Sequence, residues 1–201
     1  MEGFLKVEYE SCLGLIKYYD ERHLSLVKFT TGISSSAISL VFGFYALGAS
    51  VQNHFWSFAA VLTGVAGLGL LAVFVAMIQN RLYFVYPARQ VNAIRKVMLQ
   101  KVASEFTDNQ MYISSDFPAF KFLSLHALMN LLVAFQVGAF IGFCWFSISL
   151  DMSNVASSIR LALLIGGLAS IALFSVSSWY LASCGRYHPD RSVHREKERS
   201  R

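Results

Sequence analysis

Residues 29–80 contain no Asp, Glu, Lys or Arg, and this stretch constrains the fold more than any other feature of the sequence. Two further stretches, 122–150 and 161–185, also lack these residues, so just over half of the chain is uncharged. Only 14% of all residues are charged, against about 25% in a typical soluble domain. A water-soluble fold cannot cover so long an uncharged segment without exposing a large apolar surface. The sequence therefore predicts an integral membrane protein.

The number of spans follows from the length of these stretches. A helix needs about 20 apolar residues to cross the hydrocarbon core, so the two shorter stretches each provide one span. The longest one is sufficient for two spans, with a turn at the polar cluster Gln52–Trp56. Runs such as 59–78 lack the alternation of a barrel strand. We therefore expect an all-α integral membrane protein with four transmembrane helices, at about 29–51, 57–79, 123–149 and 160–183.

The distribution of basic residues predicts the orientation. All but one of the 17 Lys and Arg residues lie in 1–28, 79–121 and 185–201, and the exception is Arg160. Positive residues concentrate on the cytoplasmic side of a membrane, so both termini and the central loop are expected in the cytoplasm. The predicted location is the cell (inner) membrane, as a multi-pass protein. The net charge of +5 follows from this pattern and does not support contact with nucleic acid.

Residues 1–28 are expected to form a cytoplasmic N-terminal helix. Seven of its uncharged residues alternate in steps of four and three, which is the spacing of a heptad seam: Leu5, Tyr9, Cys12, Ile16, Tyr19, His23 and Leu26. Two interpretations remain open. The seam packs on the protein's own cytoplasmic loop, or it is an oligomer seam in a self-associating coiled stalk. Tyr and His are poor seam residues in coiled coils, which favours the first.

The segment 80–121 is expected to be a cytoplasmic helix and loop. Pro87 suits the first turn of a new helix, and apolar residues recur at helical spacing after it, which predicts an amphipathic helix over 88–106. This helix lies on the inner leaflet or packs on the N-terminal helix, and two amphipathic faces of similar length favour the second arrangement. Residues 122–184 hold transmembrane helices three and four, and 185–201 are a basic cytoplasmic tail.

No predicted span contains an acidic or basic side chain in its middle. Ion-coupled transporters and intramembrane carboxylate enzymes usually need one. Phosphate-loop, zinc-protease and nucleophile-elbow motifs are also missing from the sequence, and the three cysteines are too scattered for a disulfide or metal pattern. We therefore expect no enzyme activity, no cofactor and no catalytic or metal-binding residue.

The polarity of the spans is neutral. His126 and Asn130 share a helix face, Gln136 lies about two turns further along, and Ser35 and Ser39 belong to a hydroxyl-rich half of the first span. These five side chains either form interhelical hydrogen bonds or line a water-filled path. Each span also carries small residues four apart, which permit close helix packing and favour a homo-oligomer: Ser35, Ser39 and Gly43; Ala60 and Gly64; Ala134, Gly138 and Gly142; Ala162, Gly166 and Ser170.

Two segments, Glu8–Ser36 and Asn80–Arg95, together with the layout of the chain, resemble small multi-pass bacterial membrane accessory and effector proteins of antiphage systems, including the accessories of type VI CRISPR loci. The resemblance implies oligomeric membrane perturbation or pore formation triggered from the cytoplasm, and it assigns no role to individual residues. The predicted function is a homo-oligomeric, pore-forming or membrane-perturbing effector. The alternative is a non-conducting membrane scaffold or regulator that docks a cytoplasmic protein partner.

Overall fold

The computed structural model describes residues 2–47, 52–102, 117–150 and 152–186, which form four helices: α1 (Glu2–Ala46), α2 (Gln52–Val102), α3 (Leu125–Ser149) and α4 (Val155–Cys184). All four are long and apolar enough to cross a membrane, which confirms the all-helical fold with four candidate transmembrane helices. We call their uncharged parts, 29–46, 54–80, 125–149 and 161–184, the membrane-spanning segments. Most of the loop expected before residue 118, and nearly all of the basic tail, lie outside the described residues.

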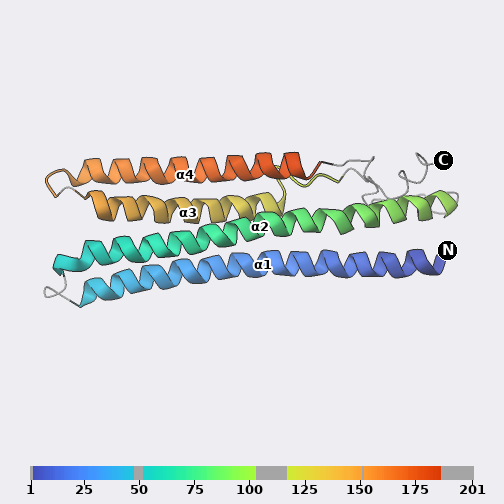
Figure 1. The fold of residues 1–201 in the computed structure, drawn as a ribbon, viewed down its shortest axis with the longest axis horizontal. Coiled ribbons are helices and arrows are strands. Elements are labelled where there is room, and N and C mark those ends of the chain that lie inside the picture. The colour runs from blue at the N-terminus through green and yellow to red at the C-terminus, as the bar shows by residue number, and fades with distance from the viewer. Residues whose placement is uncertain (1, 48–51, 103–116, 151, 187–201) are drawn as a thin grey trace, which may run out of the picture.

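The helices are arranged as an open layer in chain order (Figure 1). α1 packs on α2, α2 packs on α3, and α3 packs on α4. Among the described residues, α1 and α4 make no contact, and α1 meets α3 over only a short stretch. The protein is therefore a helical bundle that does not close on itself, and α1 and α4 form its two edges.

α1 and α2 are much longer than the other two helices. They contain 45 and 51 residues, whereas α3 and α4 contain 25 and 30. At a rise of about 1.5 Å per residue, the longer pair extends well beyond a hydrocarbon core of about 30 Å. The two helices continue side by side past the ends of α3 and α4 (Figure 1). We call this two-helix projection, residues 3–28 and 81–100, the stalk.

The turn between the first two spans lies earlier than the sequence suggests. α1 ends at Ala46 and α2 begins at Gln52, so the polar cluster Gln52–Trp56 starts α2 instead of separating the helices. Polar residues are tolerated there because the first four N–H groups of a helix have no intrahelical acceptor. The Phe44 and Phe58 rings stack with their centroids 4.1 Å apart, which holds the two helix ends together.

Pro87 does not start a new helix, because α2 continues through it. A proline inside a helix removes one backbone hydrogen bond and costs about 3 kcal/mol or more. Here the ring is buried, and its neighbours Phe84, Val85 and Ala88 form a hydrophobic cluster against Ile16 and Tyr19 of α1. Burial of this surface offsets the lost bond and keeps α2 continuous.

The seam of the N-terminal helix lies against α2. Its members are buried or half-buried along the stalk, while the residues between them are mostly exposed. The Tyr9 hydroxyl accepts hydrogen bonds from Arg95 Nε (3.2 Å) and Nη2 (3.1 Å), and Cys12 and His23 are among the buried residues. In the described subunit the seam therefore packs on α2.

α3 and α4 approach each other through glycines. A Cβ atom added to Gly166 would lie 2.8 Å from the Gly138 carbonyl oxygen, and one added to Gly142 would lie 2.6 Å from the Ala162 carbonyl oxygen. Only bare backbone fits at these positions, so the small-residue ridges of α3 and α4 pack on each other. The α2 ridge faces α3, where a Cβ on Gly64 would contact the Cys144 sulfur at 3.4 Å.

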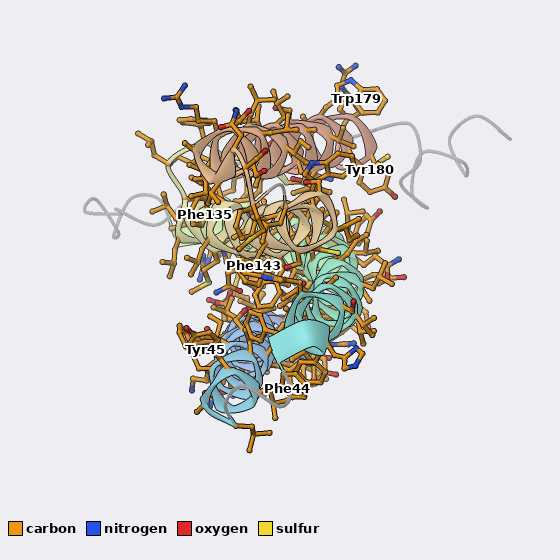
Figure 2. All side chains as sticks on the ribbon, turned by 90° about the vertical axis from the view of Figure 1, so that its left-hand side faces the viewer. Phe44, Tyr45, Phe135, Phe143, Trp179 and Tyr180 are labelled. Atoms are coloured by element: carbon orange, nitrogen blue, oxygen red, sulfur yellow. The ribbon has the colours of Figure 1, made fainter. Side chains whose placement is uncertain are left out.

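Large apolar side chains cover the outer surface of the spans. Phe135 and Trp179 are 63% and 69% exposed, and an end-on view shows both pointing away from the bundle (Figure 2). In water such a surface would drive aggregation, whereas lipid chains are as apolar as these side chains. The outer surface therefore suits a bilayer.

Candidate functional site

Four titratable or charged side chains meet where the stalk joins the membrane-spanning segments. Asp20 and His23 come from α1, Arg81 from α2 and His126 from α3, and we call them the junction cluster. His126 Nε2 lies 3.1 Å from Asp20 Oδ1, and the centroids of the His23 and His126 rings are 4.7 Å apart. His23 and Arg81 are only 1% and 3% exposed. Burial of such groups without a structural requirement is rare, so the cluster is the candidate functional site.

Arg81 is held as a buried cation. Its Nε donates to the Ala119 carbonyl oxygen at 2.9 Å, and its guanidinium lies over the rings of Phe84 and Phe117, at 4.7 and 5.6 Å from their centroids. Burial lowers the pKa of Arg81 to about 10, against the opposing effect of Asp20. Arg81 is therefore charged at neutral pH, stabilised by a carbonyl, two aromatic faces and one nearby carboxylate.

His23 and Asp20 also lie outside the membrane-spanning segments, and burial changes the pKa of each. Burial, together with the neighbouring His126 and Arg81, lowers the pKa of His23 to about 4. His23 is thus neutral at pH 7, and neither of its ring nitrogens has a hydrogen-bond partner among the described residues. Burial raises the pKa of the Asp20 carboxyl, while Arg81 acts in the opposite direction.

Two asparagines extend the polar region along the helices. Asn80 donates from Nδ2 to the Tyr19 carbonyl oxygen at 2.8 Å, which ties α2 to α1 beside the cluster. Asn130 lies one turn beyond His126 on α3 and is buried. In the described part of the chain, the side-chain oxygens of both residues have no hydrogen-bond partner. The interior of the junction between α1, α2 and α3 therefore contains acceptor oxygens that have no donor within the described part of the chain.

The junction cluster contains groups that are able to bind protons. Two imidazoles and a carboxylate surround a fixed cation, and each imidazole can take up a proton near physiological pH when it is exposed to water. Among the described residues, no three His, Cys, Asp or Glu side chains are placed to hold a metal ion. The arrangement can change its net charge without any bound group.

The structure separates the five polar residues that the sequence singled out. His126 and Asn130 lie inside the subunit, and Gln136 is half-buried further along α3. Ser35 and Ser39 are exposed on α1. These two sets therefore do not line one common surface within a subunit.

Sequence reasoning missed Asp20 and Arg81 as members of a site. In the sequence both look like ordinary charges outside the spans, and His23 looks like a seam residue. One signal was available: Arg81 is the first charged residue after the uncharged stretch 29–80. It therefore had to lie near the membrane edge, where burial of an arginine needs partners.

A second feature is a row on the outer face of α1. Every seventh residue of this helix from residue 4 to 46 is uncharged and exposed: Phe4, Ser11, Tyr18, Ser25, Gly32, Ser39 and Ala46. We call these residues the outer row. Residues 1–28 carry nine charged side chains, and none of them falls in it. Heptad spacing keeps such residues on one face of a helix that coils around a like partner.

The glycines of α1 lie on the same side of the helix and face open space. Gly3, Gly14, Gly32 and Gly43 are separated by 11, 18 and 11 residues, which are close to whole numbers of helical turns. Within the described chain, nothing lies within 4 Å of a Cβ added to any of them. The glycines of α1 thus differ from those between α3 and α4, which the subunit itself uses for packing.

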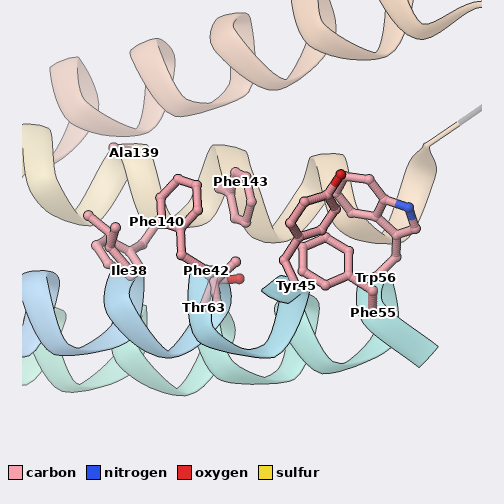
Figure 3. A pocket seen from close by; sticks show the side chains of 10 residues that line it. Ile38, Phe42, Tyr45, Phe55, Trp56, Thr63, Ala139, Phe140 and Phe143 are labelled. Atoms are coloured by element: carbon pink, nitrogen blue, oxygen red, sulfur yellow. The ribbon is translucent and has the colours of Figure 1, made fainter. Parts of the chain in front are cut away.

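An apolar cleft opens between α1, α2 and α3 near the turn that joins the first two helices (Figure 3). Its volume is about 680 Å³, and its walls include Phe42, Tyr45, Trp56 and Phe143. The hydroxyl of Thr63, which also lines the cleft, donates to the Ala59 carbonyl oxygen of its own helix at 2.6 Å. The cleft therefore presents a hydrocarbon lining, as lipid-facing surfaces do.

Comparisons of the chain with protein-family models, with curated protein sequences and with solved structures gave no match.

Proposed function

We propose that this protein is a homo-oligomeric pore of the cell membrane, in which α1 of each copy faces a common axis. The observation that carries the proposal is the outer row of α1. A glycine inside a helix is less favourable than alanine by about 1 kcal/mol. At Gly32 no contact within the described subunit uses the space that this residue leaves. A second helix can approach closely at such a position, and another copy of α1 supplies a matching row.

The membrane part of this face is suited to water. Ser35 donates from Oγ to the Thr31 carbonyl oxygen at 2.9 Å, so its hydrogen is satisfied and its lone pairs are available as acceptors. Ser39 lies one turn further on and is also exposed. Around an axis these hydroxyls would line a polar path. The proposal therefore assigns lining to Ser35 and Ser39, and not to His126 or Asn130.

The proposed orientation places the stalk and both termini in the cytoplasm. It rests on the concentration of Lys and Arg in 1–28, 79–121 and 185–201, with Arg160 as the exception, and on the positive-inside rule. The start of α1 and the end of α4 also point to the same end of the molecule (Figure 1). A cytoplasmic trigger, as in the antiphage effectors that the sequence resembles, would then act on the stalk.

Reconstitution of the full chain tests this proposal. We expect a defined oligomer in nanodiscs and ion flux through liposomes that contain it. Gly32→Leu should lower the fraction of oligomer and the ion flux by at least tenfold each, because the added side chain keeps neighbouring α1 helices apart. Gly167→Leu is the matched control, since an added Cβ there also meets nothing within 4 Å in the described structure but lies on α4. A monomer in nanodiscs and in native membranes would contradict the proposal.

The exposed apolar residues of the stalk favour a second candidate function, a scaffold that docks a cytoplasmic protein. Phe4 and Val7 are 70% and 66% exposed, although they lie outside the membrane-spanning segments. Exposed apolar patches of this kind mark interaction sites. An oligomer that Gly32→Leu disrupts, but that passes no ions, would support the scaffold over the pore.

A further inference from the structure

The junction cluster supplies a polar contact between α1 and α3. The two helices meet over only a short stretch of the described chain, and Asp20 and His23 both lie against His126 there. Ala37 of α1 also belongs to a hydrophobic cluster with Val133 of α3. The contact between α1 and α3 is therefore small, and its polar part consists of titratable side chains.

We propose that the junction cluster is a proton-binding site, and that proton uptake by His23 separates α1 from α3. With both imidazoles neutral, the charges of Arg81 and Asp20 balance. A proton on His23 adds a positive charge beside the buried Arg81, whose charge already acts on this ring, and like charges close together repel strongly where water is excluded. Separation of the helices exposes the imidazoles to water and relieves this repulsion.

The groups that face His23 come from three helices. Arg81 approaches from α2, His126 approaches from α3, and Asp20 precedes His23 by one turn on α1. Asp20 is the one carboxylate of the cluster. Its contact with His126 leaves His23 without a hydrogen-bonded acceptor among the described residues. A proton on His23 would thus meet two cationic or potentially cationic neighbours.

The size of the response follows from proton linkage. His23 has a pKa of about 4 in the closed junction and an ordinary value of 6.5 when exposed. The closed form is favoured above pH 6.5 and loses this advantage as the pH falls from 6.5 to 4. Between pH 7.5 and pH 5, His23 alone shifts the ratio of open to closed forms by about 25-fold. The raised pKa of Asp20 acts in the opposite sense, because the closed form favours a proton on this carboxyl.

This inference concerns contacts within one subunit and does not depend on the proposed pore. It is tested by measuring a distance and not a flux. Leu24 of α1 and Leu128 of α3 are both exposed and lie near the cluster. Spin labels on cysteines at these positions, with the three native cysteines replaced by alanine, report the separation of the helices. Dilution of the labelled full-length chain with unlabelled protein removes distances between copies.

Double electron–electron resonance in nanodiscs should give one distance at pH 7.5 and a second, longer distance that grows on acidification. The ratio of long to short distances should rise by about 25-fold between pH 7.5 and pH 5. A distance distribution that stays unchanged over this range would overturn the proposal, and this measurement requires no change to the cluster itself.

Histidine variants assign the response to the cluster. His23→Gln keeps a polar side chain of similar size that does not titrate, so it should reduce the pH response to less than threefold. His54→Gln is the matched control. His54 is exposed in the first turn of α2, at the end of the molecule that is farthest from the stalk. It should leave the full response. A response that persists in His23→Gln, or one that His54→Gln abolishes, would place the sensor elsewhere and overturn the inference.

Discussion

At the scale of single residues, the least expected feature is the burial of Arg81 beside a span. A buried charge is expensive unless it is paired and hydrogen-bonded. Here the guanidinium combines one carbonyl acceptor, two aromatic faces and the Asp20 carboxylate. A second arginine, Arg89, donates to the carbonyl oxygens of Phe117 and Gly185. These two arginines fix the segment before α3 and the end of α4 onto α2.

Arg81→Lys tests whether this geometry, and not charge alone, holds the junction. Lysine keeps the positive charge but lacks the planar group that stacks on aromatic rings and donates through Nε. We expect a loss of about 1–3 kcal/mol in the free energy of unfolding, because the Ala119 carbonyl loses its donor. Chemical denaturation in mild detergent measures this loss in the free energy of unfolding. Arg160→Lys, at an exposed position of α4, should change stability by less than about 0.5 kcal/mol, and an equal loss in both variants would contradict the account.

At the scale of helices, the tightest contact is that between α3 and α4. Gly166→Ala should destabilise the protein by about 1–3 kcal/mol, as overpacking does, because the added carbon would lie 2.8 Å from the Gly138 carbonyl oxygen. Gly167→Ala, one residue along, meets nothing within 4 Å in the described structure and should stabilise α4 by up to about 1 kcal/mol. Thermal unfolding of the two variants measures both effects. Equal shifts of the same sign would show that the two helices do not pack through this face.

The sequence predicts the spans better than it predicts where the helices end. Charge-free stretches identify four apolar helices, since the hydrocarbon core imposes a minimum length and excludes charge. They do not reveal that α2 runs unbroken from span to stalk. The passage of α2 through Pro87 depends on burial against Ile16 and Tyr19, which is a contact between residues about 70 positions apart in the chain. The conformational preference of the residues around a proline cannot predict such a contact.

The candidate site was only partly visible in the sequence for the same reason. His126 and Asn130 stand out because polar residues are rare in apolar helices. Asp20 and Arg81 look ordinary in charged segments, and their role appears only when three helices bring them together. Spacing also suggested the Tyr9 and Ile16 seam without showing which helix it faces. The partner of an amphipathic face is a tertiary property.

At the scale of the whole molecule, the two edges of the open layer differ. The α4 edge carries large apolar side chains such as Leu163 and Trp179, which suit lipid. The α1 edge also exposes large apolar residues, such as Leu40 and Phe42. It carries in addition the outer row, whose members from Ser25 to Ala46 are small and suit a second helix. This difference is the physical basis for assigning self-association to α1.

Substitutions at two nearby positions of α1 distinguish an effect on folding from an effect on assembly. Ile16 packs inside the stalk, so Ile16→Glu buries a charge and should melt the stalk, seen as a loss of helical circular dichroism. Tyr18 lies in the outer row and is 53% exposed, so Tyr18→Glu should leave the helical signal unchanged and reduce the oligomer mass. If Tyr18→Glu leaves the mass unchanged while Ile16→Glu lowers it without loss of helix, the two faces of α1 have been assigned the wrong roles.

In the proposed oligomer, α1 of each copy faces the axis, and Ser35 and Ser39 line a polar path. Thiol accessibility tests this arrangement most directly. Ser39→Cys should react with a charged, membrane-impermeant thiol reagent and lose most of its ion flux on reaction. Leu163→Cys, at a position 72% exposed on the α4 edge, should remain unreacted because lipid covers it. Protection of Ser39→Cys together with unchanged flux would contradict the claim.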